Sequence, residues 1–178
     1  YGRDGLIIDV RENGGGNTAD KVLAILFGAD HALVHSRDFA ETQYGYPLGR
    51  WERPLWSKPI VVMCNENSAS NAEILTHAIK NLKRGRVVGM PSGGNVISTW
   101  GRNVLDFGML RDPHRGWHLP DGTDMEWHGA VPDVIVKNDP NDLVKGKDAQ
   151  LEAAIKALTE DVAKAKAAEK TRACRAVR

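Results

Sequence analysis

The order of apolar segments constrains the fold of this chain more than any other feature of its sequence. The strand candidates are three short, almost continuously apolar runs, at residues 6–10, 59–64 and 86–89. Such runs are typical of strands that are buried on both faces of a sheet. Two segments, 18–28 and 70–85, separate these runs and carry apolar residues at the spacing of one helix face. Because helical crossovers join parallel strands, the sequence predicts an α/β fold in which the three strands are adjacent and parallel.

The segments that follow are less regular. Residues 29–57 are polar, aromatic and interrupted by Pro and Gly, so that only short strands are expected there. Extended segments are expected over 96–128, where the stretch 109–123 is interpreted as an insertion. A last short strand is predicted at 131–136.

The C-terminal part of the chain predicts a helix. Residues 149–173 are rich in Ala, Lys and Glu, which favour helices, but large apolar residues become rare in the second half. We therefore expect a core domain at 1–158 and a helical tail at 159–178. Because the chain begins with Tyr1 rather than Met, we also expect it to be a piece of a longer protein.

Charge balance and cysteine spacing argue against several classes of function. The chain has 24 basic and 23 acidic residues, so neither nucleic acid nor a membrane is expected as a partner. Cys64, which is expected to be buried, and Cys174 lie too far apart for a metal site. His114 and His118 are four residues apart, but neighbouring Pro and Gly residues argue against a helix that presents both. No metal or other cofactor is predicted.

Three polar or glycine-rich loops follow the three predicted strands. They span residues 11–17, 65–70 and 91–95. In parallel α/β sheets, ligands bind at the carboxyl ends of the strands, where loops of this kind lie. The sequence therefore predicts a functional site formed by these loops.

Ser70 lies where the second strand has ended and a helix begins. One interpretation is structural, because Ser70-x-x-Glu73 has the spacing of a capping box. The other is catalytic, because free amides at a helix N-terminus stabilise an oxyanion near a serine nucleophile. Ser68 is the competing serine in the same loop. The residues alone leave both interpretations open.

Gly14, Gly15 and Gly16 give the first loop unusual backbone freedom. A turn between a strand and a helix does not need three successive glycines. A phosphate-binding loop is disfavoured, because neither G-x-x-x-x-G-K-[ST] nor G-x-G-x-x-G is present. An oxyanion hole requires the same close approach of backbone amides without the lysine.

Glu126 is the third candidate, because it lies between two apolar residues, Met125 and Trp127. A carboxylate in apolar surroundings needs a partner, whereas a glutamate in a solvated loop does not. The neighbouring His128 is either a catalytic base or, more commonly for a single loop histidine, a hydrogen-bonded structural group.

Four stretches resemble, in this order, the tail-specific (carboxyl-terminal processing) serine peptidases, and in particular their tricorn-like branch. They are "GLIIDVRENGGGNTADKVLAIL", "KPIVVMCNENSASNAEILTHAIKNLKRGRVVGMPSGGN", "MEWHGAVPDVIV" and "KDAQLEAAIKAL". Together they span residues 5–158, with poor agreement at 29–57. The resemblance implies a crotonase-like α/β fold, with 1–158 as catalytic core. It also implies peptide or unfolded polypeptide substrates, upstream domains and a homo-oligomer.

The resemblance also implies roles for individual residues. The processing peptidases carry a Ser-Ala-Ser-Ala-Ser-Glu motif, whose second serine is the nucleophile and corresponds to Ser70 rather than Ser68. The amide of Asn71 and a glycine amide from the loop Gly14–Gly16 would form the oxyanion hole. Asn95 stands where these enzymes have a lysine base, and an asparagine side chain does not accept a proton at neutral pH.

The tricorn-like branch uses a Ser-His-Ser-Glu tetrad instead, and Glu126 corresponds to its glutamate. Its His-Ser pair precedes the first strand of this chain. The resemblance therefore implies a serine peptidase part with a nucleophile, oxyanion hole and glutamate but without a general base. Two alternatives remain: a binding or scaffold domain without catalysis, and an acyl-CoA enzyme of the crotonase type, which needs oxyanion amides but no serine nucleophile.

Overall fold

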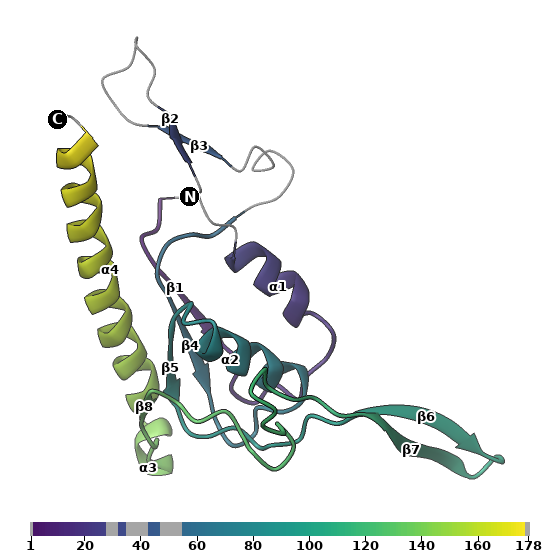
Figure 1. The fold of residues 1–178 in the computed structure, drawn as a ribbon. Helices are drawn as coiled ribbons and strands as arrows, with labels where there is room; N and C mark the ends of the chain where they lie inside the picture. Colours follow the sequence, from purple (N-terminus) through teal and green to yellow (C-terminus); the bar gives the residue numbers. More distant parts are fainter. Residues whose placement is uncertain (1, 28–31, 35–42, 47–54, 177–178) are drawn as a thin grey trace.

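A parallel four-stranded sheet forms the centre of the protein (Figure 1). The computed structural model describes residues 2–27, 32–34, 43–46 and 55–176. The strands follow the order β1 (Leu6–Asp9), β4 (Ile60–Cys64), β5 (Arg86–Gly89) and β8 (Val134–Ile135), and all neighbours are parallel. The predicted adjacent, parallel strands are therefore confirmed, and β8 falls within the predicted last strand.

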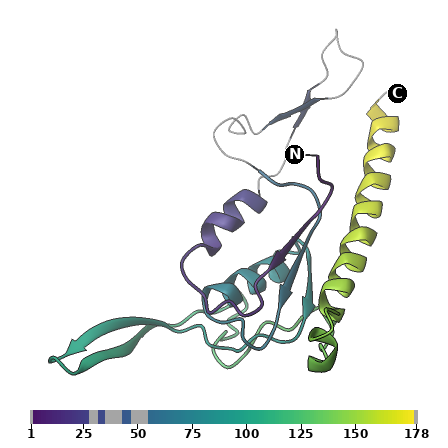
Figure 2. The ribbon, with the colours of Figure 1, turned by 180° about the vertical axis from the view of Figure 1, so that it is seen from behind.

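Helices cover both faces of this sheet. The helices α1 (Ala19–Leu26) and α2 (Asn71–Asn81) lie on one face, and α4 (Ala149–Ala176) lies on the other (Figures 1 and 2). Every residue of β4 is buried, and its side chains alternate between the two sides. Those facing α1 and α2 are Ile60, Val62 and Cys64. Val61 and Met63 pack instead with Ala154 and Ala157 of α4. Because both sides of β4 are buried, its sequence is continuously apolar and does not alternate with polar residues.

The C-terminal helix extends beyond the predicted core boundary at residue 158. It is continuous, and Arg86 of β5 forms ion pairs with Glu160 at 3.2 Å and Asp161 at 2.8 Å. Further along, Lys166 forms an ion pair with Asp4 at 2.6 Å. The first part of the segment predicted as a tail thus remains in contact with the core. A one-turn helix, α3 (Pro140–Leu143), precedes α4.

Two antiparallel pairs lie outside the central sheet. The strands β2 (Ala32–Val34) and β3 (Gln43–Tyr46) fall where short strands are expected. The strands β6 (Ser98–Val104) and β7 (Gly108–Arg115) form a hairpin that extends away from the sheet (Figures 1 and 2). The stretch interpreted as an insertion therefore begins inside β7. No helix in the described ranges is both long and apolar enough to span a membrane.

Arg11 connects the end of β1 to the start of α4. Its guanidinium forms ion pairs with Asp9 at 2.8 Å and Asp148 at 2.9 Å, and it donates to Gln150 Oε1 at 3.0 Å. The hydrogen bond from Arg11 lowers the pKa of Asp148 to about 2, although partial burial acts in the opposite direction. Because this pKa is depressed in the folded state, the contribution of Asp148 to stability is present above its ordinary pKa of 3.8 and is lost as the pH falls toward 2.

Replacing Arg11 with Gln is expected to lower the free energy of unfolding by about 1–2 kcal/mol near neutral pH. The loss is modest because solvent screens the partly exposed ion pairs of Arg11. The difference from wild type should shrink between about pH 4 and pH 2, as Asp148 becomes protonated. Urea unfolding at several pH values measures both effects. Lys147→Gln is the control, because its pair with Asp142 is exposed and spans 3.8 Å. An Arg11→Gln penalty that is independent of pH would contradict the linkage.

Candidate active site

The three predicted loops meet at the carboxyl ends of the central strands. They span residues 11–17, 65–70 and 91–95. The Ala69 amide donates to the Asn13 carbonyl at 3.0 Å, and this bond joins the first loop to the second. The Ser70 amide donates to the Asn95 carbonyl at 2.8 Å, and this bond joins the second loop to the third. A site built from three distant parts of the sequence therefore surrounds Ser70.

Ser70 is the N-cap of α2 and has a strained backbone. Its φ is 54° and its ψ is −120°, whereas residues other than glycine rarely adopt positive φ. The predicted capping box with Glu73 is present, and the Ser70 amide donates to Glu73 Oε1 at 3.1 Å. Strain of this kind costs about 1–3 kcal/mol and persists only where the surroundings hold it, typically at functional sites. A sharp turn from strand to helix is also the setting of a nucleophile elbow.

The competing serine, Ser68, has a structural role. It is fully buried, and its hydroxyl donates to the Val10 carbonyl at 2.7 Å. The same oxygen accepts from the Asn65 amide at 3.0 Å. Ser68 therefore fastens its loop to the end of β1 and presents no hydroxyl to a substrate.

The glycine loop lies directly against Ser70, as the sequence predicts. A Cβ atom on Gly15 would stand 2.6 Å from Ser70 Cβ and 3.0 Å from the Asn71 amide nitrogen, and Gly15 has a φ of 107°. The Gly15 amide is occupied, because it donates to Asn13 Oδ1 at 2.8 Å. The amides of Gly14 and Gly16 form no hydrogen bond with any described residue, so they are the loop amides that remain open to a ligand.

Asn71 connects α2 to the start of α1. Its Oδ1 accepts from the amides of Thr18 and Ala19, both at 2.8 Å. Thr18 occupies the N-cap position of α1, but its own side chain makes no capping hydrogen bond. The Asn71 amide itself has no acceptor within the described part of the chain, as expected for the first residue of a helix.

Glu126 is neither surrounded by apolar groups nor freely solvated. Met125 is buried, but Trp127 is 84% exposed, so the expectation of apolar surroundings is met on one side only. Glu126 Oε2 accepts from the amides of Val96 at 2.6 Å and Ile97 at 2.9 Å. Glu126 therefore lies beside the chain segment that follows Asn95. It forms no hydrogen bond with Ser70 in the described ranges.

Glu73 has more contacts than its predicted capping role requires. Its side chain is fully buried, and besides the Ser70 amide it accepts from the amides of Gly94 at 2.6 Å and Asn95 at 2.8 Å. Ser92 Oγ donates to the same carboxylate at 2.6 Å. The capping-box spacing of Ser70-x-x-Glu73 indicates only one of these four contacts.

No base from this chain contacts Ser70 in the described ranges. Neither a histidine nor a lysine side chain hydrogen bonds to it, and Asn95 approaches it through its main chain. His77 is buried on α2, and burial lowers its pKa, although a hydrogen bond with the His128 main chain acts in the opposite direction. The ring of His128 is exposed, with Nδ1 2.9 Å from the Glu126 carbonyl.

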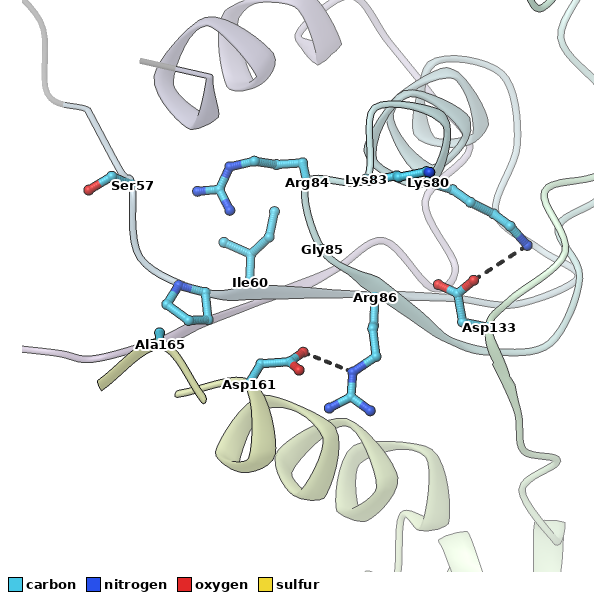
Figure 3. A pocket seen from close by; sticks show the side chains of 11 residues that line it. Ser57, Ile60, Lys80, Lys83, Arg84, Gly85, Arg86, Asp133, Asp161 and Ala165 are labelled. Atoms are coloured by element: carbon cyan, nitrogen blue, oxygen red, sulfur yellow. Dashed lines mark hydrogen bonds and ion pairs between the residues drawn. The ribbon is translucent and has the colours of Figure 1, made fainter. Parts of the chain in front are cut away.

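A cavity of about 550 Å³ lies at the opposite end of the central strands, where β4 and β5 begin (Figure 3). Two ion pairs line it, Lys80–Asp133 at 3.6 Å and Arg86–Asp161 at 2.8 Å. The cavity is therefore separate from the loops around Ser70.

Comparisons with known proteins connect this chain with a family of peptidases. The sequence model of peptidase family S41 matches residues 1–136. Tricorn protease homolog 1 of Streptomyces coelicolor is 36% identical over 155 residues, which are 86% of this chain and 14% of that protein. A probable CtpA-like serine protease of Staphylococcus haemolyticus is 26% identical over 133 residues, 74% of this chain and 27% of that protein.

A comparison of folds supports the same relationship to the tricorn protease. The crystal structure of the tricorn protease superposes with a TM-score of 0.73 at 29% identity, over 89% of this chain and 15% of that one. The chain thus spans a small part of the tricorn relatives that it matches. The resemblance seen in the sequence is confirmed, and since the family match extends through all four strands of the central sheet, this chain belongs to peptidase family S41, together with the tricorn and CtpA-like serine proteases.

Proposed function

We propose that this chain is the nucleophile-bearing part of a tricorn-like serine peptidase with a crotonase-like fold. The observation that carries the proposal is the conformation of Ser70, held at positive φ at the start of α2 with Gly15 packed against it. Peptides or unfolded chain ends are the substrates. Residues 1–158 are the catalytic core, and further domains of the parent protein and homo-oligomeric assembly complete the enzyme.

Ser70 Oγ attacks the carbonyl carbon of a peptide bond, while a histidine outside this chain takes the hydroxyl proton. The Asn71 amide and an amide of Gly14 or Gly16 stabilise the oxyanion, because none of these amides is occupied by a described acceptor. The histidine then returns the proton to the leaving amine, which breaks the C–N bond and leaves an acyl-serine. Water, deprotonated by the same histidine, hydrolyses the acyl-serine and restores Ser70.

Glu126 positions the base indirectly in this proposal. It would accept a hydrogen bond from the second serine of the tetrad, which orients the histidine. Only its Oε2 is occupied by the amides of Val96 and Ile97, so Oε1 is free of described partners. A half-buried carboxylate held by two amides keeps a fixed direction, which this role requires.

Labelling with a serine-directed phosphonate tests the proposal in the full-length parent protein. We expect covalent labelling of wild type, no labelling of Ser70→Ala, and unchanged labelling of Ser57→Ala, an exposed serine at the opposite end of the sheet. Absence of labelling in folded wild type would favour the scaffold alternative. Hydrolysis of an acyl-CoA that is unaffected by Ser70→Ala would favour the acyl-CoA alternative.

A further inference from the structure

Glu73 is a buried carboxylate that makes no ion pair with any described residue. Its side chain is 0% exposed. Oε1 accepts from the amides of Ser70 and Asn95, and Oε2 accepts from the Gly94 amide and Ser92 Oγ. A buried carboxylate without a cation is costly unless hydrogen bonds compensate for its lost hydration. Its location in the first turn of α2 adds the favourable helix dipole.

All four groups around Glu73 act as donors. Three are main-chain amides, which can only donate. The fourth, Ser92 Oγ, itself accepts from the Ala130 amide at 2.7 Å, which leaves its proton for Glu73 Oε2. Of a carboxylate, a carboxylic acid and an amide, only the ionised carboxylate accepts at both terminal atoms and donates at neither. Hydrogen bonds to an ionised acceptor are about twice as strong as those between neutral groups. The site therefore specifies a carboxylate at this position.

These bonds connect the two halves of the proposed catalytic site. Through Oε1, Glu73 holds the Ser70 amide and with it the strained backbone of the nucleophile. Glu73 also accepts from the amide of Gly94 through Oε2 and from the amide of Asn95 through Oε1. The amides of the next two residues, Val96 and Ile97, donate to Glu126. The Trp127 amide, which follows Glu126, donates to the Gly94 carbonyl at 2.8 Å. Among the described residues, Glu73 is thus the one side chain that hydrogen bonds to both the nucleophile turn and the segment that holds Glu126.

We infer that Glu73 is a positioning residue of the reaction, whose carboxylate sets Ser70 and the Glu126 segment in register. The inference rests on the proposed function and extends it beyond the tetrad. Glu73 is fully buried and does not touch the substrate, so its effect is on the geometry of the attack rather than on peptide binding. A displacement of about 1 Å at a reacting group costs about 10²-fold in rate.

The test uses Glu73→Gln in the full-length parent protein. The glutamine side chain keeps the size of glutamate but replaces one acceptor oxygen with an NH₂ donor. In one orientation this NH₂ faces the Gly94 N–H, and in the other it faces the N–H groups of Ser70 and Asn95, so that two donors meet in either case. We expect kcat to fall about 10²-fold while KM stays within about twofold. Thr76→Val is the matched control, because it removes a buried hydrogen bond from the same helix, Thr76 Oγ1 to the Ala72 carbonyl, without touching the site. It should leave kcat unchanged even where it lowers the melting temperature.

Ser92→Ala is the second variant, for the case that Glu73→Gln does not fold. It removes one donor from Glu73 Oε2 and should lower kcat about three- to tenfold. Unchanged kcat in whichever of these variants folds, or an equal fall in Thr76→Val, would overturn the inference.

Amide hydrogen exchange in the 178-residue chain separates this inference from the proposed function. Exchange at Ser70, Gly94 and Asn95 should be at least about tenfold faster in Glu73→Gln than in wild type. If the full-length wild type shows no Ser70-dependent turnover, the proposed function fails, while faster exchange in Glu73→Gln would still support the positioning of Ser70 by Glu73. Unchanged exchange would overturn that positioning, whatever the activity.

Discussion

The 178-residue chain by itself is expected to hydrolyse peptides about 10⁴–10⁶-fold more slowly than the full-length parent protein. A serine hydroxyl is a weak nucleophile near pH 7 unless a base takes its proton. In the described ranges no histidine or lysine side chain hydrogen bonds to Ser70, and the resemblance implies that Asn95 replaces the lysine of the processing peptidases. The proposed oxyanion amides alone would leave about 10³-fold of catalysis over water, which ordinary assays do not detect.

A fluorogenic peptide and a phosphonate probe measure this difference, with Ser70→Ala as the background in each protein. Robust Ser70-dependent turnover by the 178-residue chain would show that this chain supplies its own base. His128 would then be the first residue to replace, because its ring is exposed and lies next to the Glu126 carbonyl. Turnover that survives His128→Gln would point to a base elsewhere in the chain.

Gly15→Ala is expected to lower Ser70 reactivity about 10²-fold and the free energy of unfolding by about 1–3 kcal/mol. The φ of 107° at Gly15 is unfavourable for any residue with a side chain. An added methyl would also stand 2.6 Å from Ser70 Cβ and 3.0 Å from the Ala69 carbonyl oxygen. Because both atoms belong to the nucleophile turn, relief of the contact must move the loop, the turn or both.

Gly2→Ala is the control for this substitution, because Gly2 has no role in the proposed site. Its added methyl would meet no atom within 4 Å, and Gly2 is not among the residues with positive φ. Stability should therefore change by less than about 0.5 kcal/mol, and Ser70 reactivity should stay within a few-fold of wild type. Urea unfolding and the rate of phosphonate labelling in the full-length protein measure both quantities. Equal reactivity of the two variants would show that close packing of Gly15 on Ser70 is not needed.

Local sequence patterns predicted some contacts of the candidate site but not others. The choice of Ser70 over Ser68 rested on resemblance, and the structure adds a physical reason, since Ser68 is buried and holds the Val10 carbonyl. The capping-box spacing correctly indicated the bond between Ser70 and Glu73. It did not indicate the bonds from Glu73 to Gly94 and Asn95, which lie about twenty residues further along the chain.

The sequence by itself determined the order of strands and helices, the parallel sheet and the loops that carry the site. These features follow from hydrophobic periodicity and from the short reach of crossover connections, both of which are local properties. Only the tertiary structure decided which polar groups meet. Asn71 rather than Thr18 caps α1, and the Gly15 amide donates to Asn13, while the amides of Gly14 and Gly16 have no acceptor among the described residues. A hydrogen bond depends on distances of a few tenths of an ångström between segments distant in the chain, and no local pattern specifies these distances.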